Sequence, residues 1–448
     1  MQIKQHFHLE PDIGLLNDPN GLIQYKGEYY VFFQWNRFEK NHTYKEWGLF
    51  TSKDLLHWDF KASAILPDQE YDLNGVYSGS SCLIDDKIYI FYTGNRKYDG
   101  VRQSKQCLAI SDNGRNFLKK GIIINTPSLY TEHFRDPKVL KLRKNKYLLV
   151  IGAQDSINKL GAIALYYSKN GIDWQYHGKL GYSLNYQMIE CPDLFNIKGH
   201  FVLAYCLQSR DNTKDIPLKS FSVYKFINFV DSASAFENIN LDEDFNLLDY
   251  GFDFYAPQTF KDDRNRQILW AWMSRMNDEE EIFFAKKEKY IHCLTMPREL
   301  FIENGKLYQK PLEEFYKLLS NTVYDELVKD KIVIDTDYTR LFFKINSIKT
   351  NSDVFLMIKN IIRVSYKIKE QKLSVYRINW INNEWEERTC SIDKLTDIEI
   401  WLDSSSAEIF LNQGEYVFSL RFYPQDLSTN IKATMNAKLL IKQIYINK

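Results

Sequence analysis

The hydrophobic and polar positions along the first 275 residues follow a pattern that recurs five times. Each unit is a short polar turn followed by a run of aromatic and β-branched residues, which is typical of a hairpin leading into a strand. With Tyr29, Tyr89, Tyr147, Phe201 and Ile268 as equivalent positions, the units are 54 to 67 residues apart. The five units are YKGEYYVFFQWN (25–36), IDDKIYIFYTGN (84–95), LRKNKYLLVIGAQ (142–154), IKGHFVLAYCLQ (197–208) and DRNRQILWAWMS (263–274).

This spacing fits one four-stranded blade with its loops, so the repeat predicts a five-bladed β-propeller over residues 1–305. The alternative is a set of unrelated hairpins in a sandwich. Residues 306–322 contain a helical pattern of apolar positions and are expected to form a linker with a short helix. From residue 323 to 448, short alternating strands separated by turn signals predict a β-sandwich. We therefore expect an all-β chain with two domains.

Composition excludes several classes of function. The 448 residues contain 58 Lys and Arg and 58 Asp and Glu, so the chain lacks the basic surplus of a nucleic-acid-binding protein. No apolar run reaches the length of a membrane span, and the start MQIKQHFHLE has no signal core, which predicts a cytoplasmic protein without a membrane partner. The six cysteines and eight histidines show no ligand spacing, so we expect no metal and no cofactor. A homo-oligomer is left open.

The candidate catalytic residues occupy one equivalent position of the repeat. Eleven residues before each equivalent strand position stand Asp18, Ser78, Asp136, Glu190 and Pro257. Radial repetition turns such positions toward a common channel, so three carboxylates are predicted to converge there. Crowded carboxylates raise the pKa of one member, which provides an ionised group and a protonated acid, as glycoside hydrolysis requires. Calcium would also suit the carboxylates, but Arg135 beside Asp136 would compete with a cation.

The strings around these acids are NDPNG (17–21), FRDPK (134–138) and ECPDLF (190–195). Together with EWGLFTSKDLLHW, YSGSSC, GFDFYAPQTF, MPREL and DSSSAEIF, they resemble glycoside hydrolase family 32, the β-fructosidases, over nearly the whole chain. Within that family the chain looks most similar to the bacterial members that act on sucrose 6-phosphate. The resemblance implies a propeller followed by a sandwich, in agreement with the repeat. It also implies retaining cleavage of terminal β-D-fructofuranosyl bonds in sucrose 6-phosphate or sucrose, with two carboxyls roughly 5–5.5 Å apart.

The resemblance carries residue roles onto matching positions. Asp18 matches the nucleophile, Glu190 the general acid/base, and Asp136 the carboxylate that stabilises the transition state. Arg135 is expected to keep Asp136 ionised by its charge. Trp47 offers an apolar face to a sugar ring, or packs within a blade. The positions that match the substrate-binding residues are Asn17, Gln34, Trp47, Ser78 and Arg135, with Asp249 and Tyr255 as weaker matches.

Three departures from the family pattern leave the leaving-group subsite open. Leu15 and Leu16 replace a Trp-Met pair, Arg37 replaces a proline, and Leu49 replaces a histidine. A phosphate would need cations near the leaving glucose, for which Arg96, Lys97 and Arg102 are candidates; the alternative is that they are solvated loop charges.

Other functions remain open at this point. They are a cytosolic β-fructosidase for inulin- or levan-type fructo-oligosaccharides, an inverting five-bladed glycosidase for arabinans or xylans, and a non-catalytic sugar-binding propeller. The C-terminal sandwich is expected to pack against the propeller, and sugar binding is its alternative role.

Overall fold

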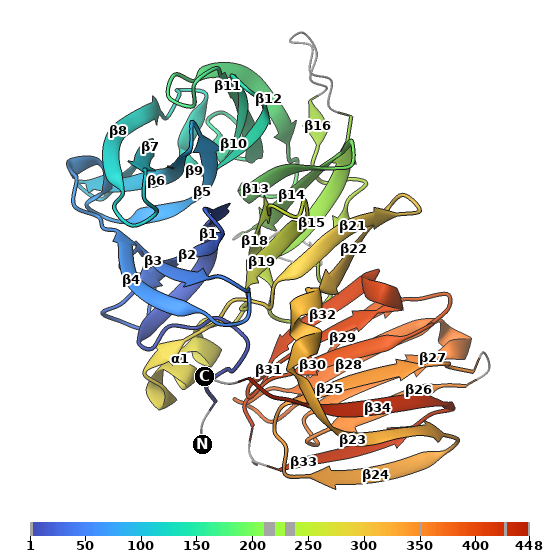
Figure 1. Cartoon of the computed structure of the whole chain (residues 1–448). Helices are drawn as coiled ribbons and strands as arrows, with labels where there is room; N and C mark the ends of the chain where they lie inside the picture. The colour runs from blue at the N-terminus through green and yellow to red at the C-terminus, as the bar shows by residue number, and fades with distance from the viewer. Residues whose placement is uncertain (1–2, 210–219, 229–237, 350–351, 425–427, 447–448) are drawn as a thin grey trace.

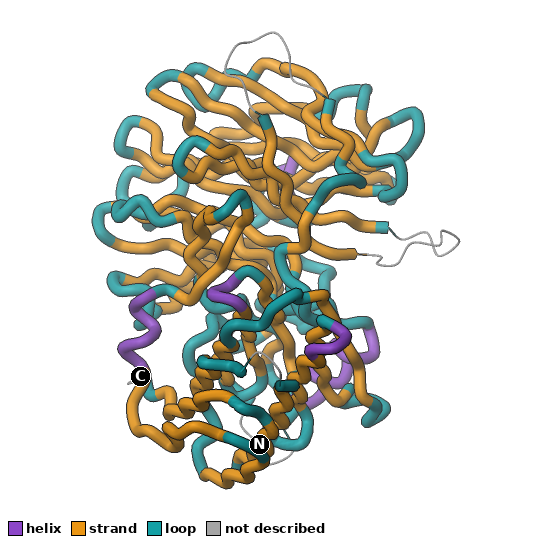
Figure 2. The backbone as a smooth tube through the Cα atoms, turned by 90° about the vertical axis from the view of Figure 1, so that its right-hand side faces the viewer, coloured by secondary structure: helices purple, strands orange, loops and turns teal. Residues whose placement is uncertain are grey.

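The strands up to Pro311 form five sheets, one for each unit of the sequence repeat. The computed structural model describes residues 3–209, 220–228, 238–349, 352–424 and 428–446. Figure 1 shows the five sheets as a blue-to-yellow body and the later strands as a second body in orange and red. Figure 2 shows that strands dominate both bodies. The predicted all-β class, a five-bladed propeller followed by a β-sandwich, is confirmed.

Each blade is an antiparallel sheet whose strands follow one another along the chain. Blade 1 contains β1 (Gly14–Tyr25), β2 (Glu28–Asn36), β3 (Glu46–Ser52) and β4 (Asp59–Ile65). Blade 2 contains β5 (Val76–Ile84), β6 (Lys87–Tyr98), β7 (Val101–Ser111) and β8 (Leu118–Asn125). Blade 3 contains β9 (Tyr130–Arg143), β10 (Lys146–Asp155), β11 (Gly161–Ser168) and β12 (Gln175–Tyr182). Blade 4 contains β13 (Met188–Ile197), β14 (His200–Gln208), β15 (Ser220–Ile227) and β17 (Asn246–Leu247). Blade 5 contains β18 (Tyr255–Lys261), β19 (Gln267–Trp272), β21 (Arg298–Glu303) and β22 (Lys306–Pro311).

The first strand of each blade lies innermost. Strands β1, β5, β9, β13 and β18 contact one another in a closed ring, and β18 meets β1 again at the seam. Two short strands add parallel pairs at the sheet edges, β20 (Tyr290–Ile291) beside β1 and β16 (Ile239–Asn240) beside β12. The ring brings residues more than 200 positions apart in the sequence to one axis, where the site is built.

Burial explains why the repeat could be recognised in the sequence. The second strand of each blade lies between neighbouring blades and is buried on both faces, so it appears as a continuous apolar run. The outer strands β4 and β8 are largely exposed and have a mixed composition. The strongest hydrophobic signals therefore mark the second strands, at one per blade.

The connection between the bodies differs from the prediction. Residues 306–311, expected to belong to a helical linker, form β22 and pair with β21 in blade 5. Only Glu313–Leu318 is helical, as a 3-10 segment, before β23 begins at Leu319. The α-helix of the described residues, α1 (Asp278–Lys287), lies elsewhere; Asn277 caps it and accepts a hydrogen bond from the Glu280 backbone N–H. The apolar positions of 306–311 fit a period of two as well as a helical one, and pairing with β21 decided between them.

The second body is a sandwich of two six-stranded antiparallel sheets. One sheet contains β23 (Leu319–Val328), β34 (Ala437–Ile444), β25 (Leu341–Asn346), β30 (Ile398–Leu402), β31 (Ser406–Leu411) and β32 (Tyr416–Arg421). The other contains β24 (Lys331–Thr336), β33 (Thr429–Thr434), β26 (Val354–Ile358), β27 (Ile362–Lys367), β28 (Lys372–Ile378) and β29 (Trp385–Ser391). Three further 3-10 segments are Glu70–Asp72, Ile368–Glu370 and Asn412–Gly414.

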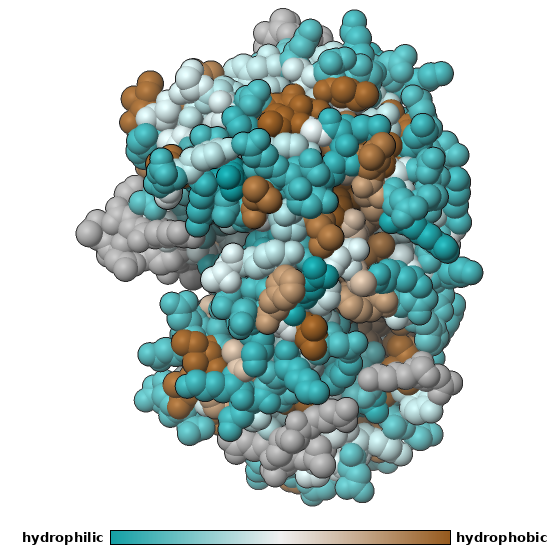
Figure 3. All heavy atoms as spheres, turned by 90° about the vertical axis from the view of Figure 1, so that its left-hand side faces the viewer, coloured by the Kyte–Doolittle hydropathy of each residue, from teal (hydrophilic) through white to brown (hydrophobic). Residues whose placement is uncertain are grey.

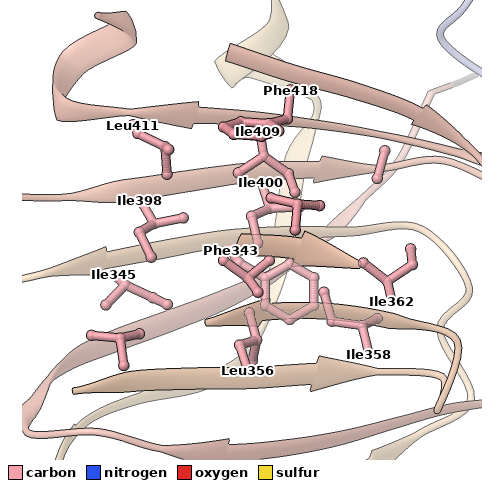
Figure 4. Close-up of a cluster of buried hydrophobic side chains, with 14 of the residues drawn as sticks. Phe343, Ile345, Leu356, Ile358, Ile362, Ile398, Ile400, Ile409, Leu411 and Phe418 are labelled. Atoms are coloured by element: carbon pink, nitrogen blue, oxygen red, sulfur yellow. The ribbon is translucent and has the colours of Figure 1, made fainter. Parts of the chain in front are cut away.

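Alternate residues of the two sheets interdigitate in the sandwich core. Figure 4 shows Phe343, Leu356, Ile400 and Ile409 meeting between the layers, and all four are fully buried. Alternation along β26 and β27 places one residue in the core and the next at the surface. The predicted β-sandwich therefore has its own hydrophobic core.

Polar side chains join the two bodies. Arg298 of β21 is completely buried and donates from Nε to Glu408 of β31 at 2.8 Å. The chain before β1 crosses to the same place, where His8 lies 2.9 Å from Asp403 and 3.0 Å from Glu408. The DSSSAEIF string thus supplies carboxylates that fasten the sandwich to the propeller and to the N-terminal segment.

One face of the molecule is mostly hydrophilic (Figure 3). On the face drawn in Figure 3, apolar side chains lie in small groups among polar ones. No helix in the described ranges has the length and hydropathy of a membrane span.

Candidate active site

All five innermost strands carry a β-bulge at the same level of the ring. In four of them the bulge includes or ends at a proline, which has no N–H to donate to the ladder. The shifts in register lie between Leu16 and Pro19, Tyr77 and Gly79, Arg135 and Lys138, Glu190 and Asp193, and Tyr255 and Gln258. Bulge residues such as Ser78, Asp136 and Cys191 line a narrow channel between the strands. Hydrogen bonds join Asp18 and Glu190 to the same group of side chains.

The bulges correct the register that the sequence suggested. Aligned on Pro19, Pro137, Pro192 and Pro257, the residues just before proline are Asp18, Asp136, Cys191 and Ala256, and the last three have left-handed backbone with φ between 47° and 64°. Glu190 stands one position earlier, in line with Asn17, Arg135 and Tyr255. The count of eleven residues was therefore wrong by one for Glu190 and Pro257. The repeated Xaa-Pro pairs in the sequence would have given both sets of equivalent positions, the residues directly before proline and those one position earlier.

Asp18 is held by neutral donors on one side of the channel. Ser78 Oγ donates to Asp18 Oδ2 at 2.5 Å, and Asn17 Nδ2 donates to Asp18 Oδ1 at 3.1 Å. Gln34 Oε1 accepts from Asn17 at 2.6 Å, while Gln34 Nε2 donates to Ser78 at 2.8 Å. These four predicted residues form a closed network that fixes the Asp18 carboxylate, and Asp18 stays partly exposed.

Glu190 is held by one cation and one phenol. Arg135 donates to Glu190 Oε1 at 2.7 Å, and the Tyr255 hydroxyl donates to Oε2 at 2.6 Å. Burial opposes ionisation of Glu190, but the charge of Arg135 and these two hydrogen bonds outweigh it, so the pKa of Glu190 lies below its ordinary value. Tyr255, a weaker match in the sequence, is thus brought into direct contact with a predicted catalytic carboxyl.

The pKa of Asp136 is shifted in the opposite direction from that of Glu190. Burial raises the pKa of Asp136 to about 7, against the lowering effect of Arg135, and the charges of Glu190 and Asp18 raise it further. The Arg135 Nε atom lies 3.9 Å from Asp136, whereas its terminal nitrogen is committed to Glu190. The prediction that Arg135 keeps Asp136 ionised was therefore wrong, because burial of Asp136 outweighs the charge of Arg135, whose terminal nitrogen donates to Glu190.

Cys191 separates the acids. Its backbone N–H donates to Asp136 Oδ2 at 3.0 Å, and its sulfur lies 3.8 Å from Asp18 and 3.7 Å from Asp136. A hydrogen bond with Cys206 and burial raise the pKa of the Cys191 thiol well above its ordinary value. The residue is therefore a protonated group between two carboxylates. Cys191 links Asp18 to Asp136, and Arg135 links Asp136 to Glu190, so the three acids do come together.

Two predicted substrate-binding residues lie elsewhere. Trp47 is completely buried, donates to the Tyr77 carbonyl and packs against Phe32, so it is a blade-packing residue rather than a sugar platform. Asp249 lies at the junction with the sandwich, where it accepts from Arg298 at 3.1 Å and from Ser419 Oγ at 2.7 Å. Both corrections concern side chains that the fold turns away from the channel.

A second polar group adjoins the site and was not found from the sequence. Lys45 is buried, its ammonium donates to Asn17 Oδ1, and it lies 3.0 Å from His42 Nδ1. His42 and His292 each approach Glu281 of α1, at 3.4 and 3.0 Å. In the described part of the chain, His42, Glu281 and His292 form the group whose geometry could hold a metal ion. The hydrogen bonds among these side chains account for their arrangement, and only tertiary contact unites them.

The arrangement brings together three carboxyls with different proton affinities. One is held by neutral donors, one is ionised by a cation, and one retains a proton near neutral pH. Such a set can supply a nucleophile, a proton donor and a hydrogen-bonding carboxyl for transfer at a glycosidic carbon.

Comparisons with known proteins agree with this geometry. The model of the Glycosyl hydrolases family 32 N-terminal domain matches residues 8–311, and that of the Glycosyl hydrolases family 32 C terminal matches residues 329–445. The sucrose-6-phosphate hydrolase of Bacillus subtilis (strain 168) is 37% identical over 445 residues, covering 97% of this chain and 92% of that protein. The sucrose-6-phosphate hydrolase of Staphylococcus xylosus is 36% identical over 465 residues, covering 97% and 90%.

Solved structures share the whole architecture. The sucrose-6-phosphate hydrolase from Lactobacillus gasseri superposes with a TM-score of 0.86 at 27% identity, covering 99% of this chain and 93% of that one. A mutant GH32 beta-fructofuranosidase of Bombyx mori, solved in complex with sucrose, has a TM-score of 0.86 at 25% identity, covering 100% and 94%. The five bulged inner strands, the converging carboxyls and both matched domains lead to one conclusion: this chain belongs to glycosyl hydrolase family 32.

Proposed function

We propose that the protein is a retaining β-fructofuranosidase that hydrolyses the bond between fructose and glucose in sucrose 6-phosphate or sucrose. The observation that carries the proposal is the convergence of Asp18, Asp136 and Glu190 within a family 32 fold. The names of the most similar relatives point to sucrose 6-phosphate. The cytoplasmic location and the state of association stay predictions.

In this mechanism Asp18 attacks the anomeric carbon of fructose while Glu190 protonates the departing glycosidic oxygen. A fructosyl–enzyme ester forms, and Glu190, now ionised, takes a proton from the water that hydrolyses it. The hydrogen bonds from Ser78 and Asn17 support this role of Asp18, since they orient its carboxylate before substrate arrives. Arg135 and Tyr255 likewise hold the Glu190 carboxyl in one orientation.

The reaction needs the proton on Glu190, whereas the free protein favours it on Asp136. Both arrangements contain the same number of protons, so substrate has only to redistribute one. Fructose hydroxyls that donate to Asp136 would favour its ionised form, and a sugar that displaces water from Glu190 would favour the protonated form there. The low pKa of Glu190 also suits its second role, because the ionised carboxylate is the base that activates water.

We expect kcat/KM for sucrose to fall on the alkaline side with an apparent pKa near 7. Asp136 binds a proton below about pH 7 and releases it above, so the proton that Glu190 needs is lost as pH rises. A rate profile across about pH 5 to 9 measures this. Tyr255→Phe removes a hydrogen bond that lowers the pKa of Glu190, so more of the shared proton should reside on Glu190, while the alkaline limb, which follows Asp136, should stay near pH 7. A wild-type profile that stays flat above neutrality contradicts the proton assignment.

The configuration of the first product tests the proposal. A covalent intermediate on Asp18 predicts that β-D-fructofuranose is released before it mutarotates, and rapid NMR of the reaction mixture observes it. Initial release of the α anomer would identify an inverting enzyme, as expected of the arabinan or xylan alternative, and would remove the nucleophile role from Asp18. Absence of turnover on any fructoside would favour a sugar-binding propeller.

A further inference from the structure

Arg275 is a partly buried cation beside the site. It follows β19 in the short segment before α1, and it lines a cleft of about 540 Å³ between the propeller and the sandwich. In the part of the chain that the structure describes, its guanidinium makes neither a hydrogen bond nor an ion pair. Arg377, which lines the same cleft, is by contrast bound to Asp253 and Glu386.

The position of Arg275 is set by an aromatic ring of the site. Its guanidinium carbon lies 4.1 Å from the centroid of Tyr255, in cation–π contact. The Tyr255 hydroxyl in turn donates to Glu190 Oε2 at 2.6 Å. The charge of Arg275 is close enough to help lower the pKa of Glu190. Arg275 therefore stands next to the acid that faces the departing sugar, and its donors remain unused.

Two other cations near the site are already engaged, and two more lie over tyrosines that do not contact the proposed acid. Arg135 is bound to Glu190, and Lys45 is buried against Asn17 and His42. Arg102, a candidate from the sequence, lies 5.6 Å from the ring of Tyr77 in blade 2. Arg96 lies over Tyr98, at the tip of the β6–β7 hairpin. Of these tyrosines, Tyr255 is the one bonded to the proposed acid.

We propose that Arg275 binds the phosphate of the departing glucose 6-phosphate and so confers preference for sucrose 6-phosphate over sucrose. The inference rests on the proposed function, because it takes Glu190 as the group on the leaving side. A phosphate ester carries about −1.5 to −2 charges near pH 7 and offers three acceptor oxygens. The two parallel N–H donors of a guanidinium fork match two of these oxygens. A guanidinium that is already stacked on an aromatic ring loses little conformational freedom when it binds phosphate.

The experiment compares specificity constants for sucrose 6-phosphate and sucrose in wild type, Arg275→Gln and Arg102→Gln. The readout is the ratio of the two constants, which cancels any effect on Glu190 or Tyr255 that both substrates share. Loss of one charge-assisted contact should lower this ratio about 10- to 100-fold in Arg275→Gln. Arg102→Gln is the matched control, an arginine over a tyrosine in another blade, and should leave the ratio as in wild type. Arg275→Lys, which retains charge without the fork, should give an intermediate ratio.

Inhibition by inorganic phosphate gives a second readout. Phosphate should compete with sucrose 6-phosphate in wild type and more weakly in Arg275→Gln. Three outcomes overturn the inference: a wild type without preference for the phosphorylated sugar, an equal loss on both sugars in Arg275→Gln, or a fall in the ratio only in Arg102→Gln. In each of them sucrose is still cleaved, so the proposed function stands; a wild type that cleaves neither sugar refutes that function instead.

Discussion

Replacing Asp18 by alanine is expected to lower kcat for sucrose by about 10⁴-fold or more. The substitution removes the atom that forms the bond to fructose, and no neighbouring carboxylate replaces it: Glu190 is tied to Arg135 and Tyr255, and Asp136 holds a proton near neutral pH. Steady-state hydrolysis measured by glucose release gives the loss directly.

The partner variant Glu190→Ala separates the role of the general acid from that of the nucleophile. Its kcat for sucrose should fall about 10²- to 10⁴-fold, because the leaving alkoxide of sucrose needs a proton. On an aryl β-fructofuranoside with an acidic leaving group, formation of the intermediate should be much less impaired, whereas Asp18→Ala should stay inactive on both substrates. If the two variants respond alike to the leaving group, the assigned roles are wrong.

Cys191→Ala is the matched control for these variants. It lies in the same bulge as Glu190, and Ala256 already occupies the equivalent bulge position with a φ of 49°, so alanine fits this backbone. We expect kcat to change by less than about tenfold, because the thiol only packs between carboxylates. A loss as large as that of Asp18→Ala would mean that the thiol takes part in the chemistry.

Arg298→Met is expected to cost about 3–5 kcal/mol of stability, the largest effect of any single change at the junction of the two bodies. Arg298 is completely buried and donates to Glu408, Asp249, Gln309 and Ser419. Methionine has a similar length but would leave Asp249 buried without its cation and Glu408 with His8 alone. The midpoint and slope of urea unfolding, followed by tryptophan fluorescence, measure the change.

Lys306→Met is the control at the same junction. Lys306 pairs with Glu415 of the sandwich, yet the lysine side chain is 58% exposed, so water already screens the pair. Its loss should cost less than about 1 kcal/mol. Equal destabilisation by the two variants would show that the buried network around Arg298 has no special weight in joining the bodies.

The order of blades could be predicted from the sequence because the signal is local. A strand buried on both faces must be apolar along its length, and a propeller repeats such a strand once per blade, as in β2, β10 and β14. The acids could be found for a related reason, since NDPNG, FRDPK and ECPDLF each lie at the start of one such unit. Asp18 and Asp136 were placed correctly by position alone, while Glu190 was one residue out of register.

The tertiary structure decided whatever depends on partners distant in the sequence. Asp249 matches a substrate-binding position in the sequence, whereas its bonds with Arg298 and Ser419, the latter 170 positions away, place it at the junction, in the lining of the cleft that Arg275 also lines. The proton on Asp136 depends on its burial in the ring and on the charges of Glu190 and Asp18 from other blades, which together outweigh Arg135. Periodicity reports which residues are buried, because burial follows from local pattern. Which charges meet, and therefore which carboxyl is ionised, follows only from how the ring closes.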